Sequence, residues 1–310
     1  MNQKSTRDAY GDTLKKIGVN RNVIVLDADL SISTKTNLFA KQYPDRFIDV
    51  GCAEQNLMGV AAGLALSGKT VFASTYAIFI LRALEQIRNT VAHDKLNVKI
   101  TVTHAGLTNS ADGASHQSLE DIAIMRAIPN MRVIVPADAI ETEQALLAEL
   151  DEHGPAYIRL NRAESPVIFD NTYEYSMNEA EILNDGQDIA LFATGTMVPL
   201  ALDAADLLRE KSIDASVVDV HTIKPLDSAT ISRICRRCGA GLTIEEHSIF
   251  GGLGSTIAEC ASENYPVPLK FIGVQDIFGQ SGEYKELLEL YGLTVKNIIG
   301  NSEKIMRARL

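Results

Sequence analysis

The sequence predicts an α/β protein of two domains, each a three-layer α/β/α arrangement around a mainly parallel sheet. Short apolar runs typical of buried strands alternate with segments of helical spacing along the chain, which is the pattern of parallel sheets. The 310 residues, 46% of them hydrophobic, are enough to bury two cores of ordinary size. Residues from about 163 to 187 lose the periodicity and become polar. We therefore expect a linker there, between domains at residues 1–165 and 186–310.

The first domain begins with a helix predicted over residues 5–18, which has a Ser-Thr start, apolar positions at helical spacing and a Gly stop. Val23-Ile-Val-Leu26 is a continuous apolar run, typical of a strand buried in a parallel sheet. A polar segment, residues 27–34, follows at the strand end, where open α/β sheets bind their ligands. The alternative for Ser33 and Thr34 is that they cap the next helix.

The alternation continues to the end of the chain. In the first half, strands are predicted at residues 69–75, 98–103, 131–136 and 156–160, and helices at residues 76–88 and 138–153. In the second half, strands are predicted at residues 189–194, 215–220, 241–245 and 269–274, with helices between them.

An acidic residue, Glu54, stands at the mouth of an apolar segment. Val60, Leu64 and Leu66 follow it among small residues, so we predict a closely packed, buried helix rather than an exposed one. An isolated carboxylate at such a place is costly unless something binds it, which makes Glu54 a candidate functional group. The alternative is a first-turn acid that the helix dipole favours.

A polar loop follows the strand predicted at residues 98–103. His104 stands at the strand end, and residues 105–117 are rich in Gly, Ser, Asn and Asp, with His116 near the end of the run. Loops of this length inside a compact domain are usually functional.

The composition excludes some partners. A net charge of −11 and a pI near 5.1 argue against nucleic acid and against an acidic membrane surface. The longest apolar run, around residues 76–84, is short and broken by Arg82, so no membrane span is expected. Four cysteines and an N-terminus without an apolar core predict a cytoplasmic location.

Two motifs of the second half give weak signals. Cys235-Arg-Arg-Cys238 has the spacing of half a zinc or redox site, but without a second pair we interpret it as two helix cysteines. Glu245-Glu246-His247 precedes a glycine-rich turn, Gly251-Gly-Leu-Gly254, that does not match the dinucleotide fingerprint. We assign Glu245-Glu246-His247 to packing or to a contact between subunits.

Four motifs of the first half, taken together, resemble the pyrimidine-binding domain of transketolases. They occur in the same order and with similar gaps: Gly51-Cys-Ala-Glu54-Gln-Asn, Ser74-Thr-Tyr76-Ala-Ile-Phe79, Thr103-His104-Ala-Gly and Asp112-Gly-Ala-Ser-His116-Gln117. Further agreement comes from Thr6-Arg-Asp-Ala-Tyr-Gly, Asp27-Ala-Asp29-Leu, Ile128-Pro-Asn-Met and Val135-Pro-Ala-Asp138. The second half resembles the C-terminal domain of the same family.

The resemblance implies thiamine diphosphate and Mg²⁺ as cofactors, and a second polypeptide that holds much of them. Transketolases also carry a diphosphate-binding domain with a Gly-Asp-Gly motif and a later Asn, and this sequence has neither. The chain therefore resembles the pyrimidine-binding subunit of a split transketolase, which would assemble as two copies of this chain with two of the partner. Mg²⁺ and the diphosphate would be held mainly by the partner, and no metal ligand is expected here.

By resemblance, Glu54 is the acid that hydrogen-bonds the aminopyrimidine of thiamine. A carboxyl there favours the tautomer whose nitrogen activates the thiazolium carbon. The resemblance places Phe79 against the pyrimidine ring with Tyr76 beside it, and Asp29 in the cofactor wall. For Tyr76 the alternative is a plain core role.

The resemblance also implies a sugar site. His104 and His116 would contact the reacting carbonyl and hydroxyls, and Asp112 would accept a hydrogen bond from a sugar hydroxyl. Ser33 and Arg162 would hold the substrate phosphate. The alternatives are a turn former for Asp112 and an interdomain ion pair for Arg162. His93, His153, His221 and His247 are given no role.

The implied activity is transfer of a two-carbon ketol unit from a ketose phosphate to an aldose phosphate. The alternatives are the beta subunit of a 2-oxo acid dehydrogenase decarboxylase, a transketolase for an unusual sugar, and a non-catalytic scaffold of the same fold. The sequence of the loop between His104 and His116 resembles that of the sugar-handling family, which argues against a 2-oxo acid dehydrogenase subunit.

Overall fold

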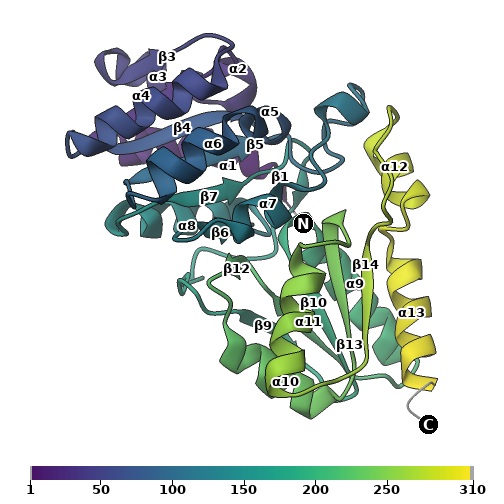
Figure 1. The fold of residues 1–310 in the computed structure, drawn as a ribbon. Coiled ribbons are helices and arrows are strands. Elements are labelled where there is room, and N and C mark those ends of the chain that lie inside the picture. The colour runs from purple at the N-terminus through teal and green to yellow at the C-terminus, as the bar shows by residue number, and fades with distance from the viewer. Residues whose placement is uncertain (1, 308–310) are drawn as a thin grey trace.

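A computed structural model describes residues 2–307 and contains two mainly parallel sheets, each packed between helices (Figure 1). The seven-stranded sheet has the order β12-β6-β7-β5-β4-β2-β3, and the five-stranded sheet has the order β14-β13-β10-β11-β9. Within these two sheets only β12 and β9 run antiparallel to their neighbours, and β1 and β8 form a separate antiparallel pair. The predicted fold class is confirmed.

The strands have these bounds: β1 Gln3–Lys4, β2 Val23–Asp27, β3 Phe47–Asp49, β4 Thr70–Tyr76, β5 Val98–Thr103, β6 Arg132–Ile134, β7 Ala156–Arg159, β8 Ser165–Pro166, β9 Glu181–Asp185, β10 Ile189–Ala193, β11 Ala215–Asp219, β12 Thr222–Lys224, β13 Gly241–Ser248 and β14 Leu269–Val274. All residues of β2, β4 and β5 are buried, and burial on both faces explains the continuous apolar run in β2.

The helices have these bounds: α1 Thr6–Ile17, α2 Ser31–Thr34, α3 Asn37–Gln42, α4 Glu54–Leu66, α5 Ala77–Ile80, α6 Leu84–Gln86, α7 Asp121–Ala127, α8 Ala139–Asp151, α9 Val198–Glu210, α10 Ser228–Cys238, α11 Leu253–Asn264, α12 Tyr284–Leu290 and α13 Val295–Arg307. Around the seven-stranded sheet, α1, α3 and α8 contribute to one apolar cluster, and α4, α5 and α7 contribute to another. None of the helices within residues 2–307 combines the length and apolar character needed to cross a bilayer.

Three local expectations need correction. The helix predicted at residues 76–88 is a succession of α5, a 3₁₀ turn, α6 and a π-helical segment that ends at Ala92. The segment predicted as a linker contains β8 and β9, and β9 belongs to the second sheet because it pairs with β11. Strand β12 leaves the second half of the chain and joins the first sheet beside β6.

Helix α4 is predicted to be a buried helix, but only part of it is buried. Leu57, Met58, Ala61 and Ala62 face the core, but Leu66 is 70% exposed. Gly59 and Gly63 are also exposed, and a Cβ atom at either position would meet nothing within 4 Å. The helix is apolar almost all round, so one apolar face remains uncovered in the single chain.

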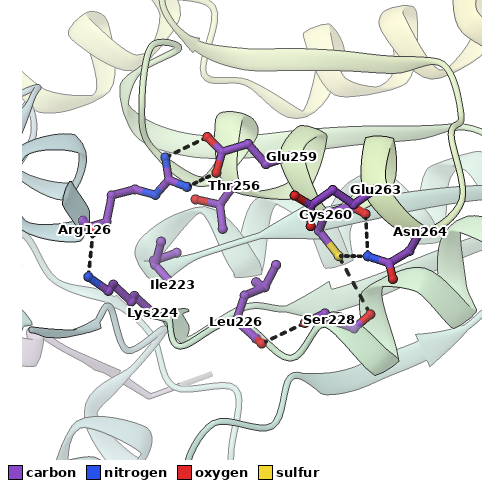
Figure 2. Close-up of a pocket in the computed structure, with 10 residues that line it drawn as sticks. All are labelled: Arg126, Ile223, Lys224, Leu226, Ser228, Thr256, Glu259, Cys260, Glu263 and Asn264. Atoms are coloured by element: carbon purple, nitrogen blue, oxygen red, sulfur yellow. Dashed lines mark hydrogen bonds and ion pairs between the residues drawn. The ribbon is translucent and has the colours of Figure 1, made fainter. Parts of the chain in front are cut away.

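The two domains share a continuous interface. Val220 and Ile223 belong to the same apolar cluster as residues of the first sheet. Figure 2 shows a pocket of about 330 Å³ at this junction, in which Arg126 of α7 pairs with Glu259 of α11. Lys224 donates to the backbone carbonyls of Arg126 and Ile128 at 2.8 and 2.6 Å. These side chains tie the domains together.

A buried pair of carboxyl groups also lies at the domain junction. Glu141 of α8 accepts hydrogen bonds from the Ala137 amide at 2.7 Å and from the Tyr173 hydroxyl at 2.8 Å. Asp219 of β11 is fully buried close to this carboxyl, and within residues 2–307 neither of its oxygens has a hydrogen-bond partner. Burial first, and then the neighbouring Glu141, raise the pKa of Asp219 well above its ordinary value.

Replacing Asp219 by asparagine should stabilise the protein increasingly as the pH rises. The unfolded chain releases the Asp219 proton near pH 4 and the folded chain keeps it, so wild-type stability falls by about 1.4 kcal/mol per pH unit above that point, until the folded pKa is passed. The introduced amide would supply a permanent donor to Glu141. Denaturant unfolding between about pH 5 and about pH 8 measures the difference. The exposed Asp203→Asn on α9 is the control, and parallel pH curves for wild type and D219N would contradict the raised pKa of Asp219.

Candidate active site

The candidate residues gather at one edge of the seven-stranded sheet. The strands β2, β4 and β5 are parallel neighbours, so the segments that follow them open on the same edge. Asp29 and Ser33 follow β2, Phe79 follows β4, and His104 follows β5. Glu54 reaches the same edge from the first turn of α4.

Glu54 lies at an open cavity of about 310 Å³. The cavity is lined by Ala28, Leu30, Cys52, Glu54, Phe79 and Arg82. The Glu54 side chain is largely buried, and its charged neighbour within residues 2–307 is the exposed Arg82, whose Nε lies 3.8 Å from Oε2. Within residues 2–307 the carboxylate accepts no hydrogen bond. It is an acceptor at the first turn of α4 that shares a cavity with the ring of Phe79.

Aromatic rings connect this cavity to both histidines. Phe79 stacks on Tyr76 with ring centroids 5.3 Å apart, and Tyr76 stacks on His104 at 3.8 Å. The edge of His116 meets Phe79 at 5.3 Å. Stacked rings fix one another's orientation, so Tyr76 links the cavity to His104 while Phe79 lines the cavity itself.

Asp29 does not line the cavity. Its backbone adopts a left-handed conformation, with φ of 63°, and its amide donates to Asp49 at 2.9 Å. The carboxylate lies 3.6 Å from the thiol of Cys52, which does line the cavity. Asp29 therefore stands beside the mouth of the cavity.

His104 is surrounded by positive charge. The Arg7 guanidinium lies 3.3 Å from its Nε2, and because a guanidinium only donates, Nε2 is the acceptor. The proton is then on Nδ1 and is donated to the Thr103 hydroxyl at 2.8 Å. Burial, and then the charges of Arg7 and Arg162, lower the pKa of His104 to about 3, so the ring is neutral at neutral pH.

Arg7, Arg162 and Ser33 are brought together beside this histidine. Arg7 also donates to the Ser33 carbonyl at 3.2 Å, and its buried Nε has no partner in the described part of the chain. Arg162 is exposed and donates to Asn109 at 3.3 Å. Since Arg162 makes no ion pair with any of residues 2–307, the interdomain ion pair considered above is wrong.

Asp27 shapes the turn that presents Ser33. Its carboxylate accepts from the hydroxyls of Thr34 at 2.6 Å and Thr36 at 2.8 Å and from the Leu30 amide at 2.6 Å. Thr34 thus serves this turn, and the helix that follows begins after Thr36, so the predicted cap by Ser33 and Thr34 is wrong. Burial raises the pKa of Asp27 to about 6 despite these donors.

The loop after β5 places Asp112 and His116 differently. Asp112 is exposed and precedes Gly113, whose φ of 75° marks a tight turn. His116 is half-buried, and its Nδ1 lies 2.9 Å from the Ser115 hydroxyl. His116 therefore reaches the aromatic wall, whereas Asp112 stands at the outer tip of the loop.

The sequence analysis missed Arg7. It lies within the motif Thr6-Arg-Asp-Ala-Tyr-Gly but has the appearance of a solvated residue in the first turn of a helix. The motif was the one feature of the sequence that could have indicated a role for Arg7. Its closeness to Ser33 and His104 becomes visible only when α1 is packed against the turn that follows β2.

The weak signals of the second half have structural explanations. The Glu245 carboxylate accepts from the Leu253 and Gly254 amides at 2.7 and 2.8 Å, so the anion position at the start of α11 is filled by the chain's own carboxylate. Cys235 and Cys238 are buried residues of α10 that form no disulfide within residues 2–307, as the two-helix-cysteine interpretation predicts. No group of three or more His, Cys, Asp or Glu within residues 2–307 is placed to hold a metal ion.

Comparison with known proteins agrees with the fold. Residues 2–167 match the family model for the transketolase pyrimidine-binding domain, and residues 178–298 match the model for the transketolase C-terminal domain. A protein from Methanocaldococcus jannaschii described as a putative transketolase C-terminal section is 48% identical, with 95% of this chain and 94% of the relative covered.

Two further relatives are similarly close. A 6-deoxy-6-sulfo-D-fructose transketolase subunit from a Clostridium species is 41% identical over 96% of this chain and 94% of the relative. A solved structure, a split-gene transketolase described as an inactive β4 tetramer, is 46% identical with a TM-score of 0.90, and 98% of both chains are covered. This chain belongs to the transketolase family and carries its pyrimidine-binding and C-terminal domains.

Proposed function

We propose that this chain is the pyrimidine-binding subunit of a two-chain, thiamine diphosphate-dependent transketolase. The observation that carries the proposal is Glu54, a largely buried carboxylate with an unused acceptor at a cavity with an aromatic wall. Rings join this cavity to two histidines. An acid, a flat apolar wall and two imidazoles are what pyrimidine binding and sugar chemistry need from one chain.

The cavity fits the aminopyrimidine of thiamine diphosphate. Glu54 would accept a hydrogen bond from the ring, and Phe79 would lie against its face, with Tyr76 behind and Asp29 beside the opening. When bound, the cofactor supplies a nucleophilic thiazolium carbon. The role of Glu54 is to hold the aminopyrimidine in the tautomer that activates this carbon.

The residues around His104 suit an anionic sugar. Arg7, Arg162 and Ser33 lie where they can hold a phosphate. The Nε of Arg7, which has no partner within residues 2–307, could donate a hydrogen bond to a phosphate oxygen. Neutral His104 can accept a hydrogen bond from a sugar hydroxyl in place of Arg7. His116, and Asp112 at the loop tip, would contact other oxygens of the sugar. We propose a ketose phosphate as donor and an aldose phosphate as acceptor.

We propose that the active assembly contains two copies of this chain and two of a diphosphate-binding partner, which holds Mg²⁺. The inactivity of the related β4 tetramer supports the need for a second kind of chain. The uncovered face of α4, with Gly59, Gly63 and Leu66, supports self-association. A cytoplasmic location belongs to the same proposal and is consistent with four cysteines that form no disulfide within residues 2–307.

Glu54→Gln should abolish most of the activity of the reconstituted two-chain enzyme. An amide does not favour the reactive tautomer, so kcat should fall about 10²- to 10⁴-fold. The assay is ketol transfer between sugar phosphates, run beside lipoamide-linked 2-oxo acid decarboxylation to separate the two enzyme classes.

The control for this experiment is Glu210→Gln, an exposed change on α9 far from the site. Unchanged activity of E54Q would support the scaffold alternative and reject the proposal. Lipoamide-linked turnover without ketol transfer would instead assign the chain to the 2-oxo acid dehydrogenases.

Arg7→Met should raise the pKa of His104 and weaken binding of sugar phosphates. Burial, the larger cause of the lowered pKa, remains in this variant, so the pKa should rise above about 3 yet stay below 6.5. Titration of the histidine ring protons by NMR measures this shift in the isolated chain, with His104→Gln for assignment. Arg88→Met, an exposed change, is the control. Wild-type His104 that titrates near 6.5 would contradict the described site.

A further inference from the structure

Glu246 of β13 reaches from the second domain into the first. It is buried, with 3% of its surface exposed, and its carboxylate accepts four hydrogen bonds. The donors are the Leu107 amide at 2.5 Å, Asn161 Nδ2 at 3.1 Å, the Thr196 hydroxyl at 3.1 Å and the Tyr284 hydroxyl at 2.8 Å. Two of these donors belong to the first domain and two to the second.

The two donors of the first domain lie in the segments that carry the proposed sugar-binding residues. Leu107 lies three residues after His104, at the start of the loop that carries Asp112 and His116. Asn161 directly precedes Arg162. Its position is fixed by its backbone N–H, which donates to the Thr6 hydroxyl at 2.8 Å. One carboxylate therefore holds the segments that follow β5 and β7.

The loop is shaped to admit this carboxylate. Gly106 has a φ of 63°, and a Cβ atom there would lie 2.5 Å from Oε1 of Glu246. Any larger residue would displace the carboxylate from the Leu107 amide. The close approach explains the glycine at this position.

The two donors of the second domain extend the connection to the tip of the loop. Tyr284 begins α12, which lies beside the first domain in Figure 1. The segment before it contacts the loop directly, because the Gly282 amide donates to the Ser110 carbonyl at 3.1 Å and Gln117 donates to the Gln280 carbonyl at 3.1 Å. The second domain thus contacts the loop twice, through Glu246 at its start and through the segment before Tyr284 further along. The hydrogen bond from Tyr284 to Glu246 connects these two contacts.

We propose that Glu246 is a positioning residue for the sugar site, acting through the Leu107 amide and Asn161 without touching the substrate. This inference rests on the proposed function. It gives the second domain a task in the reaction, which is to hold the histidine-bearing loop and the neighbouring Arg162 in register with the cavity at Glu54. A displacement of about 1 Å at such a site can cost on the order of 10²-fold in rate.

The test is Glu246→Gln in the reconstituted two-chain enzyme, with Glu245→Gln as matched control. Glu245 is the adjacent buried glutamate of the same strand, and its hydrogen bonds to Leu253 and Gly254 stay within the second domain. E246Q should lower kcat/KM for the sugar phosphate about 10- to 100-fold, with thiamine diphosphate affinity changed less than about twofold. E245Q should lower thermal stability without this loss. Equal kcat/KM for the two variants would overturn the proposal.

Hydrogen exchange of the isolated chain provides a readout that does not depend on activity. The amides of residues 105–117 should exchange at least about tenfold faster in E246Q than in wild type or E245Q. Tyr284→Phe, which removes one donor and keeps the carboxylate, should give a smaller effect of the same direction if E246Q does not fold. Unchanged amide exchange in folded E246Q would contradict the positioning role of Glu246. Absence of ketol transfer in the wild-type two-chain enzyme would instead contradict the proposed function alone.

Discussion

The site depends on how the second domain closes the loop-bearing edge of the seven-stranded sheet. At the centre of that closure lies a fully buried ion pair, in which Arg159 Nε donates to Asp121 at 2.8 Å. Arg159 also donates to the Glu246 carbonyl of the second domain at 3.0 Å. Burying two charges costs several kcal/mol, which their attraction only partly offsets. The pair therefore fixes the arrangement of the domains more than it stabilises them, and breaking it would leave an uncompensated charge in the interface.

The two halves of the site have opposite physical characters. At Glu54 an acceptor is left unused beside an aromatic wall, and the cavity in front of it is open. At His104 the ring nitrogens are both engaged and positive charge surrounds them. The first half suits a flat ring with N–H donors, and the second suits an anion with hydroxyl groups. Tyr76, stacked between Phe79 and His104, separates the two halves and sets their spacing.

Periodicity predicted the elements that are buried on both faces and failed where tertiary contacts decide. Strand β2 has a continuous apolar run, and β5 alternates β-branched apolar residues with Lys99, Thr101 and Thr103, so the positions of both strands could be predicted. Strand β9 was missed because its residues are only half-buried at a sheet edge, where polar side chains are tolerated. The open face of α4 was missed because an apolar helix reads as buried whether its cover comes from the same chain or from another. Arg7, likewise, gains its meaning only from packing against the turn after β2.

The role of Glu246 is invisible in the sequence for a physical reason. A glutamate in a strand of a second domain gives no sign of which backbone amide it meets 139 residues earlier in the chain. Gly106 is the local trace of that contact, but a glycine in a polar loop is ordinary. Only the folded chain shows that the glycine makes room for the carboxylate and that the same carboxylate holds Asn161. The second domain, which contributes none of the residues proposed to touch cofactor or sugar, thereby determines the geometry of the first domain's site.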